Sequence, residues 1–144
     1  MALTADRLPP ETRYIDQSVG GVVIEYTVAA STTIYKGAFV RIDAGGDIEP
    51  CASTSTEPCL GVALEKADNS GGADGDIRCR VLGGAIIEHA ITATVADIEA
   101  PVYTSDDETL TLTSTTNELL GVLIGIADTN TGIIKCMWPG TGLN

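Results

Sequence analysis

Three observations predict an all-β protein, a small β-barrel or sandwich. Short apolar runs rich in β-branched residues recur along the chain, separated by turns of Gly, Asn, Asp and Pro. Helical periodicity is almost absent. One motif occurs twice, at 60–79 and at 120–136, and each copy has the form of a β-hairpin whose second arm carries a basic residue and a Cys.

The two copies define the expected organisation. Each begins with Leu-Gly-Val and continues with Ala-Asp at the same spacing, and upstream the segment 37–43 resembles 100–106. We therefore expect two pseudo-repeated β units, about 30–83 and 93–138, inside a single β domain over 21–144. Cys79 and Cys136 fall at equivalent positions in this alignment, which predicts a shared buried role, because a free Cys behaves as a small hydrophobe.

Residues 1–20 precede the domain and lack any periodicity. They contain Pro9-Pro10 among polar residues, so we expect an extended N-terminal arm. Leu8, Tyr14 and Ile15 are then candidates to dock on a neighbouring protein, because an extended segment can add a strand to an exposed sheet edge. The alternative is a frayed terminus.

In the first half, the β-branched run 22–28 predicts a strand, and 31–34 is interpreted as a turn. The segment 37–43 alternates, and Ala38, Val40 and Ile42 form its better candidate for the core face. Gly45-Gly46 supplies a tight turn. Further strands are expected at 48–51, 60–64 and 77–83, with 65–76 as the loop of the first hairpin.

The second half opens with a predicted strand at 85–91, with a helical turn as the alternative. Thr94 followed by Asp97 has the spacing of a helix N-cap with an acidic third residue, so 95–99 is the one short helix expected, and Pro101 stops it. Leu110 and Leu112 point inward from the alternating run 109–113. Strands at 119–126 and 133–138 complete the unit.

Composition excludes several classes of function. The net charge is −12 with eight Lys and Arg, which predicts no nucleic-acid partner, because phosphates are held by clustered cations. No apolar run reaches the roughly 18 residues of a membrane span, and the N-terminus lacks a signal-peptide pattern, so we expect synthesis in the cytosol and no membrane partner. The four cysteines contain no Cys-x-x-Cys, which predicts free thiols; a Cys51–Cys59 bridge is the alternative.

Asp68, Asp74 and Asp76 are the only metal-ligand candidates, because carboxylates on a Gly-rich loop are the oxygen ligands that calcium takes. The pattern lacks the acidic twelfth residue of an EF-hand loop, and the second copy of the motif has lost most of these carboxylates while keeping the turn residues. We therefore interpret the loop as a solvated turn and expect no metal and no cofactor.

No residue pattern predicts catalysis. His89 is the only histidine, and the chain has no Gly-x-Ser-x-Gly elbow, no Walker loop and no dinucleotide-binding motif. An enzyme would have to use the three aspartates of the loop as a metal site. The chain is therefore expected not to be an enzyme.

Four stretches together resemble the head decoration, or capsid cement, proteins of tailed bacteriophages. They are Thr12-Arg13-Tyr14-Ile15, Thr-Ile-Tyr-Lys-Gly-Ala-Phe-Val at 33–40, Leu-Gly-Val-Ala at 60–63, and Ala-Asp-Asn-Ser-Gly-Gly-Ala-Asp-Gly-Asp-Ile at 67–77. The resemblance implies a β-rich protein, commonly a homotrimer, that binds the outer surface of the major capsid protein shell and stabilises the head. It also implies synthesis in the host cytoplasm and a place on the capsid exterior.

The same resemblance adds Arg13 to Leu8, Tyr14 and Ile15 as expected contacts with the capsid or with neighbouring subunits. A second function stays open, a secreted or virion-borne β-domain that binds a carbohydrate or a cell-surface receptor. Such a domain needs an aromatic platform. The residues that would supply one are Tyr26, Tyr35, Tyr103 and Trp138.

Overall fold

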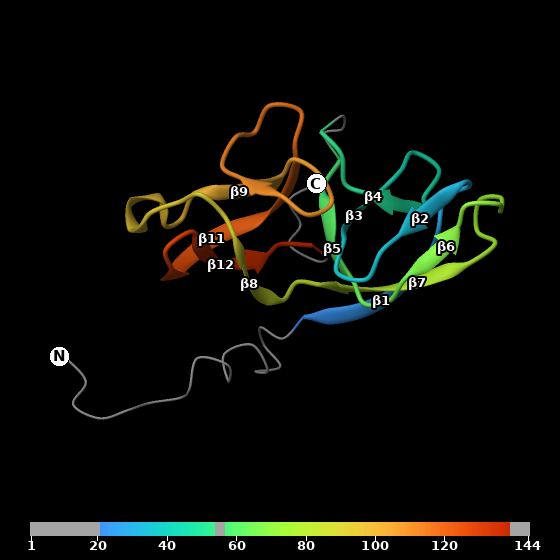
Figure 1. The fold of residues 1–144 in the computed structure, drawn as a ribbon, viewed down its shortest axis with the longest axis horizontal. Helices are drawn as coiled ribbons and strands as arrows, with labels where there is room; N and C mark the ends of the chain where they lie inside the picture. Colours follow the sequence, from blue (N-terminus) through green and yellow to red (C-terminus); the bar gives the residue numbers. More distant parts are fainter. Residues whose placement is uncertain (1–20, 54–56, 139–144) are drawn as a thin grey trace, which may run out of the picture.

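A computed structural model describes residues 21–53 and 57–138 and shows an all-β protein (Figure 1). The strands form two five-stranded antiparallel sheets and one two-stranded sheet. Neither five-stranded sheet closes into a continuous barrel, although a single parallel bridge, Val28 to Ile48, joins the two edges of the first. In the described part of the chain, no helix has the length and apolarity needed to cross a membrane.

The first sheet has the order β1-β7-β5-β3-β4. Its strands are β1 (Val22–Thr27), β7 (Arg78–Gly83), β5 (Cys59–Ala63), β3 (Phe39–Ile42) and β4 (Ile48–Pro50). The second sheet has the order β10-β9-β11-β12-β8. Its strands are β10 (Leu110–Thr111), β9 (Pro101–Thr104), β11 (Glu118–Asp128), β12 (Thr131–Cys136) and β8 (Ile86–Ala90).

The two-stranded sheet pairs β2 (Thr32–Ile34) with β6 (Ala67–Asn69). The sequence analysis interpreted 31–34 as a turn and 65–76 as a loop, and both interpretations are wrong where these two strands form, at 32–34 and 67–69. Each strand has only three residues, too few for a period-2 pattern to stand out. The pairing becomes visible only when the partner, 35 positions away, is known, as in the Thr33 to Asp68 pair.

The two five-stranded sheets follow one plan, in which β1, β7, β5, β3 and β4 correspond in order to β8, β12, β11, β9 and β10. Their registers agree as well. Val40 lies opposite Gly61 in the first sheet, and Val102 lies opposite Gly121 in the second. In both sheets the register then shifts by one residue, so that the Leu before the glycine forms a bulge. The predicted pseudo-repeat is therefore present in the strand pairing itself.

The two equivalent glycines explain why Leu-Gly-Val stands in both copies. A Cβ on Gly61 would lie 2.1 Å from the backbone oxygen of Leu82, and a Cβ on Gly121 would lie 1.9 Å from the backbone oxygen of Lys135. Real Cβ atoms do not approach a backbone carbonyl this closely. Each bulge therefore requires a residue without a side chain, where the neighbouring strand passes closest.

The equivalence expected for Cys79 and Cys136 is wrong. Because Leu82 corresponds to Lys135, the residue that corresponds to Cys136 is Gly83. Both cysteines are buried, but Cys79 belongs to the core of the first sheet and Cys136 to the core of the second. The sequence alignment placed its gap in the turn and so misaligned the second arm of the hairpin by four residues.

Two hydrophobic cores lie on the two faces of the first sheet. The core between the first sheet and the β2–β6 pair contains Val28, Ile34, Ala38, Val40, Ile48, Leu60, Ala63, Ala67, Cys79 and Val81. The core between the two five-stranded sheets contains Phe39, Cys51, Cys59, Ile91, Val102, Leu110, Leu120, Leu123, Ile134 and Cys136. The expectation that one face of 37–43 meets the core was therefore incomplete. Val40 enters one core and Phe39 enters the other.

The predicted short helix is a single 3-10 turn, Val95–Asp97. Its capping box is present: the Thr94 hydroxyl accepts from the Ala96 N–H at 3.3 Å, and the Thr94 N–H donates to the Asp97 carboxylate at 2.8 Å. The turn does not extend to residue 99 because Glu99 has a positive φ of 79° and its N–H donates to the Leu123 backbone oxygen at 2.7 Å. Tertiary pairing thus ends the helix early.

Candidate functional site

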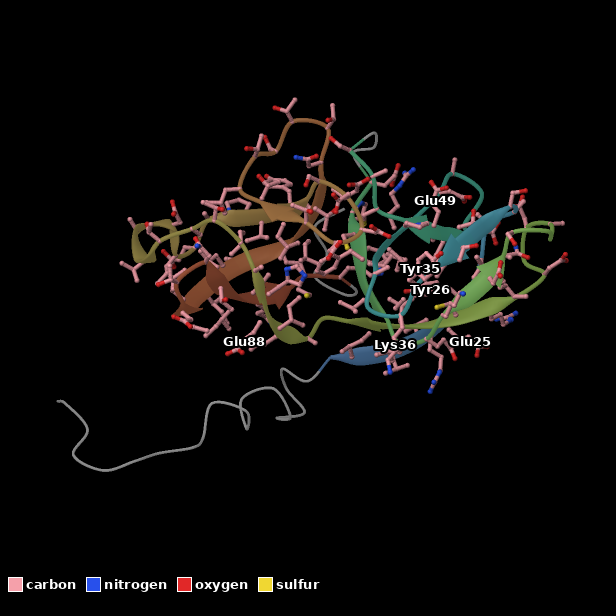
Figure 2. All side chains as sticks on the ribbon, in the orientation of Figure 1. Glu25, Tyr26, Tyr35, Lys36, Glu49 and Glu88 are labelled. Carbon is pink, nitrogen blue, oxygen red and sulfur yellow. The ribbon has the colours of Figure 1, made fainter. Side chains whose placement is uncertain are left out.

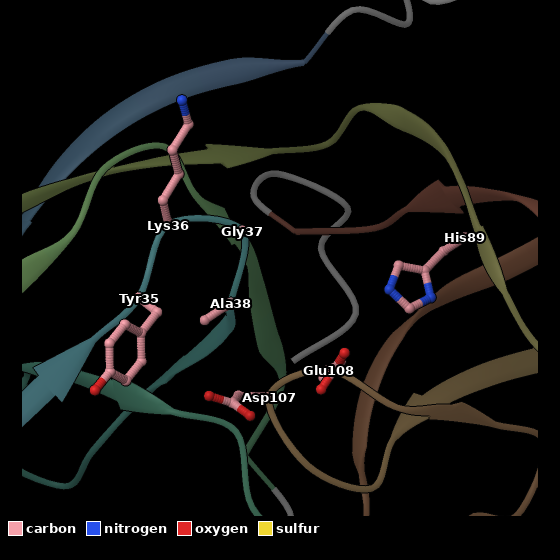
Figure 3. A pocket seen from close by; sticks show the side chains of 7 residues that line it. All are labelled: Tyr35, Lys36, Gly37, Ala38, His89, Asp107 and Glu108. Atoms are coloured by element: carbon pink, nitrogen blue, oxygen red, sulfur yellow. The ribbon is translucent and has the colours of Figure 1, made fainter.

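A pocket of about 530 Å³ lies where the two repeat units meet (Figure 3). Its lining residues are Tyr35, Lys36, Gly37, Ala38, His89, Asp107 and Glu108. The first four come from the connection between β2 and β3, His89 comes from β8, and the two carboxylates come from the turn between β9 and β10. A backbone hydrogen bond of 2.8 Å from Phe39 N–H to the Asp107 oxygen fixes one wall against the other.

We call this hollow the junction pocket, and its lining is mainly polar and charged. Lys36 brings a cation, and Asp107 and Glu108 bring carboxylates. The His89 ring packs edge-on against Phe39 at 5.1 Å between centroids, and its Nδ1 lies 2.9 Å from the Ala90 oxygen. Neither Ser nor Cys is among the described residues that line the pocket, so a His-activated nucleophile of the serine or cysteine type has no partner there.

A second pocket of about 500 Å³ adjoins the first through His89 and Glu108. Its other lining residues are Ala90, Thr109 and Leu110. These belong to the end of β8 and the start of β10, which are the two edge strands of the second sheet. We call the gap between the edge strands of a sheet its seam, and this hollow the seam pocket.

The three aspartates proposed as metal ligands each bind the protein backbone. Asp68 accepts from Ser70 N–H at 3.1 Å, Asp74 accepts from Ala30 N–H at 2.7 Å, and Asp76 accepts from Ala73 N–H at 2.8 Å. Among the described residues, no group of three or more His, Cys, Asp or Glu side chains is arranged to hold a metal ion. The carboxylates act as turn and loop acceptors.

Hydrogen bonds at this loop lower the pKa values of two of its carboxylates, Asp68 and Glu65. Hydrogen bonds from Ser70 and then from Thr33, whose hydroxyl lies 3.2 Å from the carboxylate, hold the pKa of Asp68 below its ordinary value. The same effect occurs at the base of the loop, where Arg80 lowers the pKa of Glu65 through its backbone N–H at 2.9 Å and its side chain. Both carboxylates are therefore ionised at neutral pH.

Asn69 organises this loop, a role that the sequence analysis did not assign to it. It is buried, and its Nδ2 lies within hydrogen-bond distance of the backbone oxygens of Val28, Ala29 and Ala73, at 3.2, 2.9 and 2.8 Å. A Cβ on Gly72 would lie 2.0 Å from its Oδ1. An Asn before a Gly-Gly turn is the sequence signal for such a role, because Asn readily bonds nearby backbone groups.

The four aromatic residues considered as a carbohydrate platform come from separate parts of the fold. Trp138 Nε1 lies 3.4 Å from the Tyr26 hydroxyl, and both side chains pack against the first core. Tyr35, labelled in Figure 2, is 60% exposed. The Lys66 ammonium lies 5.2 Å from its ring centre. Tyr103 lies on β9 of the second sheet. The described structure therefore does not assemble one stacking surface from these four residues.

The four thiols are free and buried. Burial raises the pKa of the Cys136 thiol to about 12, and burial together with the contact to Cys51 raises that of Cys59. Burial also raises the pKa of the Cys79 thiol. All four residues are hydrophobic core components, since each belongs to one of the two cores. The raised pKa values of Cys59, Cys79 and Cys136 also disfavour the thiolate, which is the reactive form of cysteine.

Sequence analysis missed the ionic contact between the two sheets. Arg41 on β3 lies between Glu49 and Glu118, and its Nε is 3.5 Å from Glu118 Oε1. Glu118 is fully buried and also accepts from the Ala52 N–H and the Thr104 hydroxyl, both at 3.2 Å. Nothing in the run Thr-Thr-Asn-Glu distinguishes this carboxylate from a surface residue.

Leu8, Arg13, Tyr14 and Ile15, the contact residues expected in the arm, lie outside the described residues.

Comparison with known proteins identifies the family. The family model described as phage cement protein matches residues 18–137, which covers both five-stranded sheets. Neither a curated protein nor a solved structure matches the chain. The chain therefore belongs to the phage cement protein family, whose members are structural proteins of the virion associated with the capsid shell.

Proposed function

We propose that this chain binds the outer surface of the shell formed by the major capsid protein and stabilises the phage head. The observation that carries the proposal is the match to the phage cement family along 18–137. Stabilisation of this kind comes from area buried between proteins, and it needs exposed edges and complementary surfaces instead of reacting groups.

The edge of the first sheet next to the arm supports the proposal. Val22 and Val23 on the edge strand β1 are 51% and 52% exposed, and only Gly21 separates them from residues 1–20 in the chain. Apolar side chains on an exposed strand edge favour association, because the edge also presents backbone groups that can pair with another chain. We infer that this edge and the arm form one contact region.

In this proposal Leu8, Arg13, Tyr14 and Ile15 contact the shell or a neighbouring subunit, and the protein is a homotrimer. A closed symmetric oligomer covers edges that would otherwise pair without limit. The net charge of −12 keeps the free protein soluble in the host cytoplasm, where we propose that it is made, and favours a basic partner surface on the capsid exterior.

The binding experiment uses purified heads that lack this protein. The full chain, residues 21–144, and the quadruple variant L8A/R13A/Y14A/I15A are mixed with heads, and the bound fraction is measured by sedimentation. We expect the full chain to bind and the other two to lose binding at least tenfold, because they lack the arm contacts. A variant with T4A and E11A is the matched control and should bind as the full chain does.

Two outcomes separate the parts of this proposal. If the full chain does not bind heads, the capsid function is wrong; if residues 21–144 bind equally well, only the role of the arm is wrong. Head stabilisation is read from the temperature at which heads become permeable to a DNA dye, which should rise when the protein binds. A mass of three times 14.9 kDa in solution would establish the trimer.

A further inference from the structure

The two five-stranded sheets are stacked in the same orientation. Val40 and its register equivalent Val102 lie on what we call the inner face of each sheet. This inner face borders the first core in the first sheet and the second core in the second sheet. The opposite, outer face of the first sheet supplies Phe39, Cys59 and Val62 to the second core. The outer face of the first sheet therefore packs on the inner face of the second.

The outer face of the second sheet is apolar and, among the described residues, has no such cover. Register equivalence with the first sheet places four largely apolar residues on it. They are Pro101, Tyr103, Leu119 and Val122. Pro101 is exposed, the other three are half-buried, and none of the four contributes to either core. Because β9 and β11 are adjacent strands, these side chains form one continuous surface.

The two ends of this stack of sheets differ in polarity. At one end the β2–β6 pair covers the inner face of the first sheet, and its own outward side is polar, since the Thr33 hydroxyl donates to Asp68 at 3.2 Å. Figure 1 shows this pair and the strands β9 and β11 at opposite sides of the molecule. A stack of repeated units needs polar outer faces at its ends to remain soluble. The apolar outer face at the β9–β11 end therefore favours a protein partner.

Charge favours a second copy of this chain over the shell as that partner. Lys135 lies directly opposite Val122, so its side chain is on the same face. The chain has a net charge of −12, so a neighbouring copy offers this cation an excess of carboxylates, whereas the basic shell surface proposed above would repel it. The covered outer face of the first sheet has the same combination, because its Arg41 reaches Glu118 of the second sheet.

We propose that copies of this chain associate through the outer face of the second sheet. In the homotrimer, each copy buries its four apolar residues against its neighbours, and Lys135 meets carboxylates of the adjacent copy. The number of copies rests on the proposed function, and the choice of face does not. The edge of β1 stays available to the shell, so the two contact surfaces are separate.

Charge introduced on the outer face tests the proposal. The full chain, Y103E and V122E are compared by their mass in solution over a range of protein concentrations. We expect the full chain to have three times the chain mass of 14.9 kDa. Both variants should need at least about tenfold higher concentrations to associate, because a carboxylate is costly to bury among apolar groups. Urea unfolding verifies that both are folded.

The matched control is Y35E. Tyr35 is 60% exposed and lies on the connection between β2 and β3, outside the outer face of the second sheet. Y35E introduces the same charge as Y103E and should keep the mass of the full chain.

The accessibility of a thiol tests the same face with a smaller change. V122C and the control Y35C are alkylated with iodoacetamide at protein concentrations above and below the one at which the oligomer dissociates. The four native cysteines are buried. We expect the thiol of V122C to react at least about tenfold more slowly in the oligomer than in the dissociated chain, because the contact has to open first. The thiol of Y35C should react at the same rate in both.

The outcomes separate this inference from the proposed function. If Y103E and V122E keep the oligomer mass, or V122C reacts equally fast in both states, the choice of face is wrong and capsid binding is unaffected. Loss of head binding by V122E at unchanged mass would place the face against the shell and overturn the inference. A full chain that is monomeric at every concentration also overturns it. A dimer that both variants dissociate would support the face and contradict only the homotrimer.

Discussion

The two five-stranded sheets have the same strand order and equivalent registers, but different segments cover them. The first sheet is buried on both faces, by the β2–β6 pair and by the second sheet, and a bridge closes its seam. The second sheet buries one face, while Tyr103, Leu119 and Val122 on the other stay half-buried, and its seam holds a pocket. The repeat thus sets strand order and bulges, and the segments added to it determine which surfaces remain for contacts.

The largest expected effect tests whether the two ladders are equivalent. G61A and G121A should each lower the free energy of unfolding by more than about 4 kcal/mol, because both place a Cβ against a backbone carbonyl that cannot move independently. Urea unfolding followed by circular dichroism measures the loss. The matched control is G71A, where a Cβ would meet nothing within 4 Å.

Unequal losses of unfolding free energy in G61A and G121A would show that the two bulges are not equivalent. If G121A unfolded at the wild-type urea concentration while G61A did not, the second sheet would tolerate a different bulge and the correspondence would be limited to strand order.

The next effect concerns the contact between the sheets. E118Q should cost about 3 kcal/mol of unfolding free energy, because it leaves Arg41 without its buried partner. E49Q removes the more exposed partner of the same arginine and should cost less than about 1 kcal/mol. Urea unfolding compares them. Equal losses would show that the buried carboxylate contributes no more than the partly exposed one.

A smaller effect concerns an element found only in the second unit. T94A removes the hydroxyl of the capping box and should cost about 1 kcal/mol. The conservative variant T94S keeps the acceptor oxygen and should unfold close to the wild-type urea concentration. Were T94A and T94S to unfold alike, the capping hydroxyl would contribute no stability, and backbone hydrogen bonds such as that from Glu99 to Leu123 would hold the connection to β9.

The smallest effect concerns the β2–β6 pair, which only the first unit contains. The pKa of Asp68 is lowered in the folded protein, so its stabilising effect is present above the unfolded pKa of about 4 and is lost as pH falls through the folded value. D68N should therefore show a shallower loss of stability on acidification than the wild type. Urea midpoints measured from about pH 7 to about pH 3 test this. Parallel curves for the two proteins would mean that Asp68 does not contribute.

Sequence reasoning was strongest where a local pattern determines a local structure. The duplicated Leu-Gly-Val, the alternation around Val40 and the Thr94 capping signal all correspond to observed features. It was weakest where distant segments meet. The burial of Phe39 in the second core depends on contacts between the two units, and the β2–β6 pairing joins segments 35 positions apart in the first unit. No periodicity within one segment reports either contact.

The candidate site shows the same division. The turn interpretation of the acidic loop could be made from residue types, because Asn, Asp and Gly have well-known backbone preferences. Glu118 could not be identified in advance, since its burial follows from Arg41 on another sheet. The junction pocket was equally invisible, because Lys36, His89 and Glu108 are far apart in the sequence.

The buried thiols bear on durability outside the host. Under the proposed function, the protein passes from the reducing host cytoplasm to oxidising surroundings, where accessible thiolates become linked or oxidised. Here burial raises the pKa of Cys136 to about 12 and also raises the pKa values of Cys59 and Cys79, so the reactive form is scarce at neutral pH. The four cysteines can therefore pack in the cores without being oxidised after release, for as long as the two sheets stay folded.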